Sequence, residues 1–163
     1  MLQQLRINGG VYDHSKTRVD ITSAYPVSPM IKNYITEFNF KSAMNGDTNV
    51  YGTQVSPLGQ TYGNYAAEFG FTILKEGWDL WMSTWPSGFR GIGFDVTISF
   101  LNPLSPLGPV STVYIPDVYI VGTEVSSSTG GKEIDVKVTT LVSGVIEENG
   151  KSLIPFDQDL AVL

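Results

Sequence analysis

The chain has 163 residues, which fits one domain and is enough to bury a hydrophobic core. With 42% hydrophobic and 16% charged residues it is typical of a globular protein, and no apolar run approaches the ~20 residues of a membrane-spanning helix. A net charge of −6 argues against a protein that grips nucleic acid, and the absence of cysteine excludes disulfides, thiol nucleophiles and cysteine-ligated metals. The first ten residues lack the basic segment and apolar core of a secretory signal, so export by that route is not expected.

The first third of the chain predicts a hairpin, a strand and an arm. Residues 5–21 alternate apolar and polar side chains around an Asn-Gly-Gly turn at 8–10, the pattern of a β-hairpin. In residues 35–41, Phe38 and Phe40 alternate with polar neighbours, which indicates a half-buried strand. Residues 42–63 are rich in Gly, Asn, Ser and Thr, and a structureless stretch of this length is uncommon inside a compact domain. We therefore predict an extended arm at 42–63, with room for a short hairpin of its own.

Residues 64–85 contain a switch from strand to helix. A long alternation over 64–74 predicts a strand. The apolar period then changes to that of one helical face, with Trp78, Trp81, Met82 and Trp85 at i, i+3, i+4 and i+7. Pro86 ends this pattern, and Gly77 weakens the first turn, so the helix is expected to depend on tertiary contacts. The stripe favours a core-facing helix around 75–85 that covers one face or one open end of a sheet.

The second half of the chain again has the pattern of strands. Residues 91–100 return to period two, and two extended runs follow at 111–125 and 132–148. Pro116 confines the first of these runs to a sheet edge or a bulge. Asn149-Gly150 predicts a tight turn into a short final strand. Between the strands, residues 101–109 repeat proline and leucine every third position, which would place the leucines on one ridge of an extended loop that needs a partner.

Candidate catalytic groups are few. The only histidine is His14, beside Asp13 and Ser15, and neighbours in sequence rarely converge as a catalytic triad. One histidine without cysteine excludes the usual zinc sets, and no calcium-loop pattern occurs. The carboxylates of Glu133 and Asp135 alternate with apolar residues, as on a solvated strand face. We therefore expect neither an enzyme nor a cofactor.

The order of these elements resembles that of the tail tube proteins of tailed bacteriophages. The resemblance spans nearly the whole chain and rests on "LRINGGVYDHSKTRVDI", the polar excursion, "EFGFTILKEGWDLWMSTW", "GFDVTISF" and "VGTEVSSSTGGKEIDVKVTTLVSGVIEENGKSL". It implies an all-β fold, a β-sandwich or small barrel of mostly antiparallel strands with one flanking α-helix, in a single domain over 1–163. It also implies hexameric rings that stack into a tube for genome ejection. Related rings belong to secretion systems and contractile particles.

The same resemblance implies partners and a location. The partners would be further copies of the chain and other tail proteins such as sheath, baseplate or terminator, with viral DNA passing without specific binding and no membrane contact. The location would be the virion tail, after assembly in the host cytoplasm. Two alternatives stay open: another tail or neck ring, such as a terminator or tube initiator, and a carbohydrate-binding β-sandwich that uses its aromatic residues.

Two sets of residues follow as hypotheses. Subunit contacts are expected in the arm and along the leucine ridge, at Asn45, Asp47, Val50, Tyr51, Val55, Leu58, Leu101, Leu104 and Leu107. Residues on a polar strand face are expected to line the bore, at Glu133, Asp135 and Lys137.

Overall fold

The computed structural model describes residues 17–45, 48–50, 59–61, 64–100, 111–127 and 133–153. The strands in these ranges are β1 (Thr17–Ser23), β2 (Ile35–Asn45), β3 (Thr48–Val50), β4 (Gly59–Thr61), β5 (Asn64–Leu74), β6 (Phe94–Phe100), β7 (Ser111–Ser126), β8 (Asp135–Val142), β9 (Glu147–Glu148) and β10 (Lys151–Ser152). The helices are the α-helix α1 (Lys75–Met82) and the short 3-10 helices η3 (Pro29–Asn33) and η4 (Phe89–Gly91).

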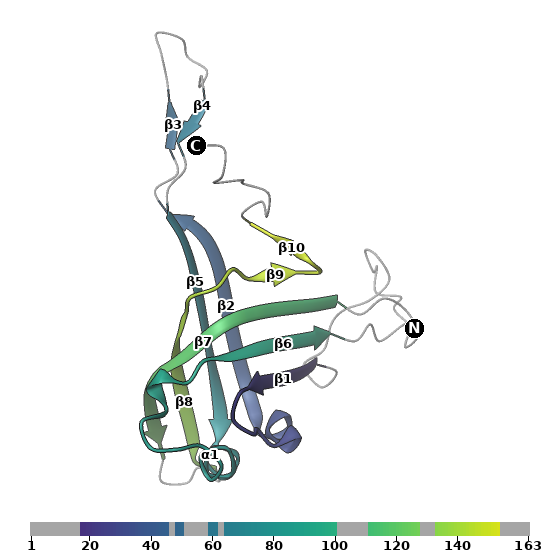
Figure 1. The fold of residues 1–163 in the computed structure, drawn as a ribbon, viewed down its shortest axis with the longest axis vertical. Helices are drawn as coiled ribbons and strands as arrows, with labels where there is room; N and C mark the ends of the chain where they lie inside the picture. Colours follow the sequence, from purple (N-terminus) through teal and green to yellow (C-terminus); the bar gives the residue numbers. More distant parts are fainter. Residues whose placement is uncertain are drawn as a thin grey trace, which may run out of the picture.

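Most strands belong to one curled, antiparallel sheet. Its order is β1-β6-β7-β8-β5-β2, and β9 joins it by pairing with the first part of β7. β1, β6 and the first part of β7 run across β2 and β5, so the sheet curls into a half-barrel (Figure 1). This confirms the predicted all-β, mostly antiparallel class with a single flanking helix in the described part of the chain.

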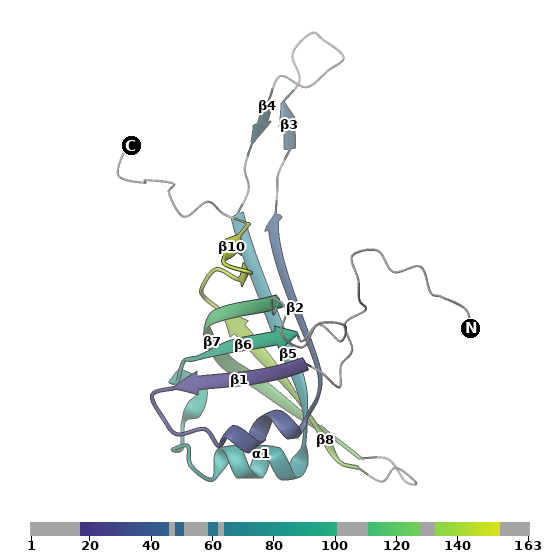
Figure 2. The same ribbon diagram turned by 90° about the vertical axis from the view of Figure 1, so that its right-hand side faces the viewer.

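The core fills the inside of the curl, and α1 closes one end of it (Figures 1 and 2). Trp81 is fully buried, and its ring stacks on Phe71 with centroids 5.6 Å apart. It also makes edge contacts with Trp85 and Phe94 at 5.3 and 5.5 Å. The tryptophan stripe is therefore core, and the prediction that this helix covers an open end is confirmed.

The helix begins three residues before its tryptophan stripe. No side chain caps its N-terminus at Leu74. Gly77 is buried against the connection that leaves η3: a Cβ built on it would lie 2.3 Å from Cβ of Tyr34 and 2.5 Å from Cγ. In addition, the Leu74 amide donates to the Tyr34 carbonyl at 3.0 Å. Gly77, interpreted from sequence as a weak point, is thus a site of close approach.

The predicted arm at 42–63 starts inside the main sheet. Residues 42–45 belong to β2, and their partners are 64–67 of β5, so the sheet continues four residues into the predicted arm. Beyond it, β3 and β4 pair as a separate two-stranded sheet, which extends past the ends of β2 and β5 (Figures 1 and 2). The predicted hairpin turn at 8–10 lies outside the described residues, as does the loop at 101–109.

The strand with proline is central and bulged. Pro116 lies in β7, which pairs with β6 on one side and with β8 on the other. Opposite the single residue Asp95 of β6, β7 has two residues, Pro116 and Asp117, and Asp117 takes a positive φ of 53°. Of the two positions that the sequence allowed this proline, an edge or a bulge, the bulge is the one observed.

The predicted turn at Asn149-Gly150 is also present. Both residues have positive φ, 54° and 76°, and they connect β9 to β10, whose Lys151 pairs with Glu148. Asparagine and glycine tolerate this conformation better than other residues, which is why the pair marks the turn in the sequence.

Candidate assembly surfaces

The half-sheet of β8, β5 and β2 has one apolar and one polar face. Phe69, Phe71, Ile73, Val136 and Val138 of the inner face are buried in the core. The outer face carries polar side chains, and a shallow groove of about 780 Å³ crosses it. The residues of that face along the groove are Glu37, Asn39, Glu68, Gly70, Thr72, Lys137 and Thr139. Since the inner face is filled, this outer face is the one that can meet solvent or a partner.

The structure brings two of the three predicted bore residues together. Asp135 opens β8 and Lys137 follows two positions later, so both lie on the outer face, and Lys137 is exposed. In register, Lys137 lies between Glu124 of β7 and Thr72 of β5. Asp135 is half-buried, and its Oδ1 has no hydrogen-bond partner among the described residues. Glu133 is exposed and precedes the strand.

Most predicted subunit contacts lie outside the described residues. Asn45 ends β2, is exposed and faces Asn64 in register. Val50 ends β3, opposite Gly59 of β4. The remaining predicted contacts are outside the described ranges: Asp47, Tyr51, Val55, Leu58, Leu101, Leu104 and Leu107.

In the described part of the chain, the main strand order of the sheet has two end strands, and the short β10 ends a branch that leaves β7 through β9. β1 and β2 stand at the two ends of the strand order, so one side of each has no neighbouring strand. β2 is 11 residues long, and such an edge presents a row of unpaired N–H and C=O groups to another chain. The sequence predicted long strands but not which of them would be edges, because this depends on long-range pairing.

The bulge in β7 is bridged by the side chain of Asp95. The Asp117 amide donates to Asp95 Oδ1 at 3.1 Å, and the Tyr114 hydroxyl donates to Asp95 Oδ2 at 2.9 Å. From the other side, the Ser143 amide donates to the Asp117 carbonyl at 2.9 Å. Both oxygens of one carboxylate are therefore engaged at the point where β7 passes from one half-sheet to the other.

Tyr114 is expected to titrate at unusually high pH. The hydrogen bond to Asp95 raises the pKa of the Tyr114 hydroxyl above its ordinary 10.0, and burial and the nearby carboxylates add to the effect. Because the folded pKa exceeds the unfolded one, this contribution to stability is complete below pH ~10 and is lost as pH rises through the folded value. The absorbance difference at 295 nm between the wild-type protein and Tyr114→Phe measures this midpoint. Asp95→Asn should lower it, and a wild-type midpoint at or below 10 would contradict the interpretation.

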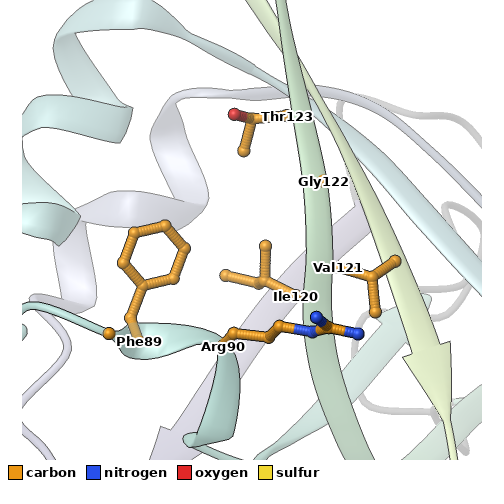
Figure 3. A pocket seen from close by; sticks show the side chains of 7 residues that line it. Phe89, Arg90, Ile120, Val121, Gly122 and Thr123 are labelled. Atoms are coloured by element: carbon orange, nitrogen blue, oxygen red, sulfur yellow. The ribbon is translucent and has the colours of Figure 1, made fainter.

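A small pocket lies between η4 and the second irregularity of β7 (Figure 3). Phe89 and Arg90 line one side, and Ile120, Val121 and Thr123 line the other. Its volume of about 220 Å³ is below the roughly 300–1,000 Å³ typical of small-molecule sites. The pocket therefore does not suggest a metabolite site.

The tryptophans of the stripe, two on α1 and Trp85 just after it, do not form a sugar platform. The exposed fractions of Trp78, Trp81 and Trp85 are 8%, 0% and 7%, so none offers a ring face to solvent. Within the described ranges, no three acidic or histidine side chains are grouped as a metal site. The same ranges contain no helix with the length and apolarity needed to cross a membrane.

Comparisons by sequence and by structure differ in outcome. No protein-family model matches the sequence, and no curated protein matches it. By structure, the chain is similar to the SPP1 tail tube, with a TM-score of 0.55 and 14% identity over 85% of this chain and 79% of the other. A type six secretion system protein gives a TM-score of 0.52 and 12% identity, covering 83% and 88%.

A third similar structure comes from the baseplate of the anti-feeding prophage, with a TM-score of 0.50 and 9% identity over 90% of this chain and 97% of that one. At these identities the likeness concerns the fold. The resemblance predicted from the order of elements is confirmed at this level: the chain has the fold found in a phage tail tube, a type six secretion protein and a prophage baseplate component.

Proposed function

We propose that the chain is a structural, non-enzymatic protein of a phage tail, one domain of which six copies form a ring. The rings stack into the tail tube, the conduit for genome ejection. The observation that carries this proposal is the fold shared with the SPP1 tail tube over 85% of the chain. Its partners are further copies of itself and other tail proteins, and its location is the virion tail after assembly in the host cytoplasm.

The position of β1 and β2 at the ends of the main strand order of the described residues supports the ring. Main-chain groups along the outer sides of β1 and β2 gain hydrogen bonds when a neighbouring copy pairs with them, and a closed ring leaves no edge unpaired. In such a ring the outer face of β8, β5 and β2 lines the bore, since the opposite face is core. The proposed bore residues Asp135 and Lys137 lie on that face, with Glu133 beside it.

The charges on this face suit a conduit. Lys137 lies opposite Glu124 in register, and Glu37 lies beyond its other neighbour, Thr72. Glu68 of the same face lies opposite Lys41. The chain as a whole carries a net charge of −6. A wall with a weak negative balance repels phosphates instead of binding them, so it does not arrest moving DNA.

Electron microscopy of the purified, concentrated protein tests the proposal. Rings or tubes with a central bore are expected without any added ligand. A chain that stays monomeric at high concentration would contradict the proposal. Rings that never stack would favour the alternative of a terminator, initiator or baseplate ring, for which the similarity to the prophage baseplate component is the supporting observation.

The arm can be tested separately, because the sheet register permits its clean removal. Asn45 and Asn64 face each other across β2 and β5, so a two-residue Asn-Gly turn can replace 46–63 and close a hairpin. We propose that the arm contacts the next ring of the stack. We therefore expect this variant to unfold cooperatively, with an unfolding midpoint close to that of the wild type, but not to form long tubes. Tubes of normal length would refute this role for the arm. Contacts by Leu101, Leu104 and Leu107 remain part of the proposal.

A further inference from the structure

β7 is the strand that joins the two halves of the curled sheet. Its first part, up to Val118, pairs with β6, and from Val118 onward it pairs with β8. The change of partner coincides with the bulge at Pro116 and Asp117. A bulge bends its strand and increases the local twist, so the conformation at this point sets the angle between the half-sheets.

The bulge is held from both sides. Asp95 accepts hydrogen bonds from Tyr114 and from the Asp117 amide, and Ser143 donates to the Asp117 carbonyl. Gly144 packs against the same bend: a Cβ built on it would lie 2.5 Å from Cγ of Pro116 and 2.9 Å from the Pro116 carbonyl oxygen. Asp117 has positive φ without being glycine, a conformation that needs such support.

We propose that the Asp95 carboxylate is the clasp that fixes the bend of β7 and thereby the angle between the end strands β1 and β2. The second part of the inference rests on the proposed function. In a ring closed by edge pairing, the angle between a subunit's two edges decides how many copies complete the circle. Asp95 is then a positioning residue for assembly, acting through the bend and not through contact with a neighbouring copy.

The first test measures the clasp itself. Asp95→Ala removes both acceptors, and amide exchange at Asp117, followed by NMR, is expected to accelerate at least about tenfold. Asp95→Asn retains one acceptor oxygen for the Asp117 amide and an N–H that can donate to Tyr114, so its exchange is expected within about threefold of wild type. The matched control is Asp79→Ala, which removes an exposed acid of α1 whose partner is Lys75. Unchanged exchange in Asp95→Ala would overturn the clasp.

The second test measures the angle without requiring assembly. The chain has no cysteine, so spin labels can be attached at Arg18→Cys on β1 and Lys41→Cys on β2, both exposed positions near the two edges. With Asp95 present, the distance between the two spin labels is expected to have a single narrow distribution. In Asp95→Ala this distribution is expected to be broadened or shifted. An unaltered distribution would refute control of the angle.

A second variant covers the case in which Asp95→Ala does not fold. Tyr114→Phe removes one of the two hydrogen bonds to the Asp95 carboxylate and is expected to give a smaller change in the same direction. No change in the distance distribution of this variant would refute the proposal.

The third test links the angle to assembly. Wild-type protein and Asp79→Ala are expected to give rings of one diameter in micrographs, whereas Asp95→Ala gives mixed diameters or open arcs. Uniform rings from a variant with fast exchange at Asp117 would overturn the link between clasp and ring. Absence of rings from the wild-type protein would count against the proposed function, while the exchange and distance measurements would still decide the clasp.

Discussion

Replacing Trp81 with alanine is expected to lower the free energy of unfolding by about 3–5 kcal/mol. The side chain is fully buried and contacts four aromatic rings, those of Phe71, Trp78, Trp85 and Phe94. Its removal leaves a cavity at the place where α1 closes the curl, and the rigid strands around it cannot collapse to fill the space. Urea denaturation followed by far-ultraviolet circular dichroism measures the loss.

The control for this prediction lies on the same helix. Leu80, the residue before Trp81, is 37% exposed, so Leu80→Ala is expected to cost less than about 1 kcal/mol. If Trp81→Ala cost no more than Leu80→Ala, the helix would not be part of the core, and the account of how the sheet is closed would be wrong.

Gly77→Ala is expected to destabilise the protein by about 1–3 kcal/mol or more, although alanine is the better helix former by about 1 kcal/mol. The added Cβ would lie 2.3 Å from Cβ of Tyr34, so α1 and the end of η3 would have to separate. That movement would also strain the hydrogen bond from the Leu74 amide to the Tyr34 carbonyl. Thermal unfolding of the purified variant measures the effect.

Two comparisons make this prediction specific. Gly91→Ala places its Cβ in open space, with no atom within 4 Å, and should change stability by less than about 0.5 kcal/mol. In a Gly77→Ala background, Tyr34→Ala should not restore stability, because the closest contact is with the Tyr34 Cβ itself. A more stable Gly77→Ala protein would show that helix propensity outweighs the contact.

The spacing of apolar residues along the chain predicted the strands and the helix that have one buried face. The alternation at 64–74 coincides with β5, because one face of this strand is core and the other is polar. The spacing of Trp78, Trp81 and Trp85 identified α1 and its buried face. The helix starts at Lys75, as predicted, and ends at Met82, three residues before the predicted end at 85, so Trp85 follows the helix. The importance of Gly77 depends on Tyr34, which is 43 residues away in sequence and comes close only through the fold.

The candidate surfaces were predictable to a similar degree. Alternation in β8 correctly separated Asp135 and Lys137 from the buried Val136 and Val138. Pro116 signalled a bulge because proline cannot donate a hydrogen bond to the ladder. The role of Asp95 at that bulge had no local signal, since it depends on the register between β6 and β7. The same holds for the identity of the two edge strands, which follows from the order of all six strands in the sheet.

Because α1 closes the curl within a single chain (Figure 1), folding and the proposed assembly are separate steps. The fully buried large side chains in the described ranges belong to one core cluster of this chain, so that core needs no second molecule to form. In the proposed ring, the end strands would contribute main-chain hydrogen bonds, which are weak singly and effective only in a row, beside the apolar contacts proposed for Leu101, Leu104 and Leu107. Under the proposed function, folded subunits would stay dispersed until a template offers matching end strands, so nucleation and not folding would set the timing of growth.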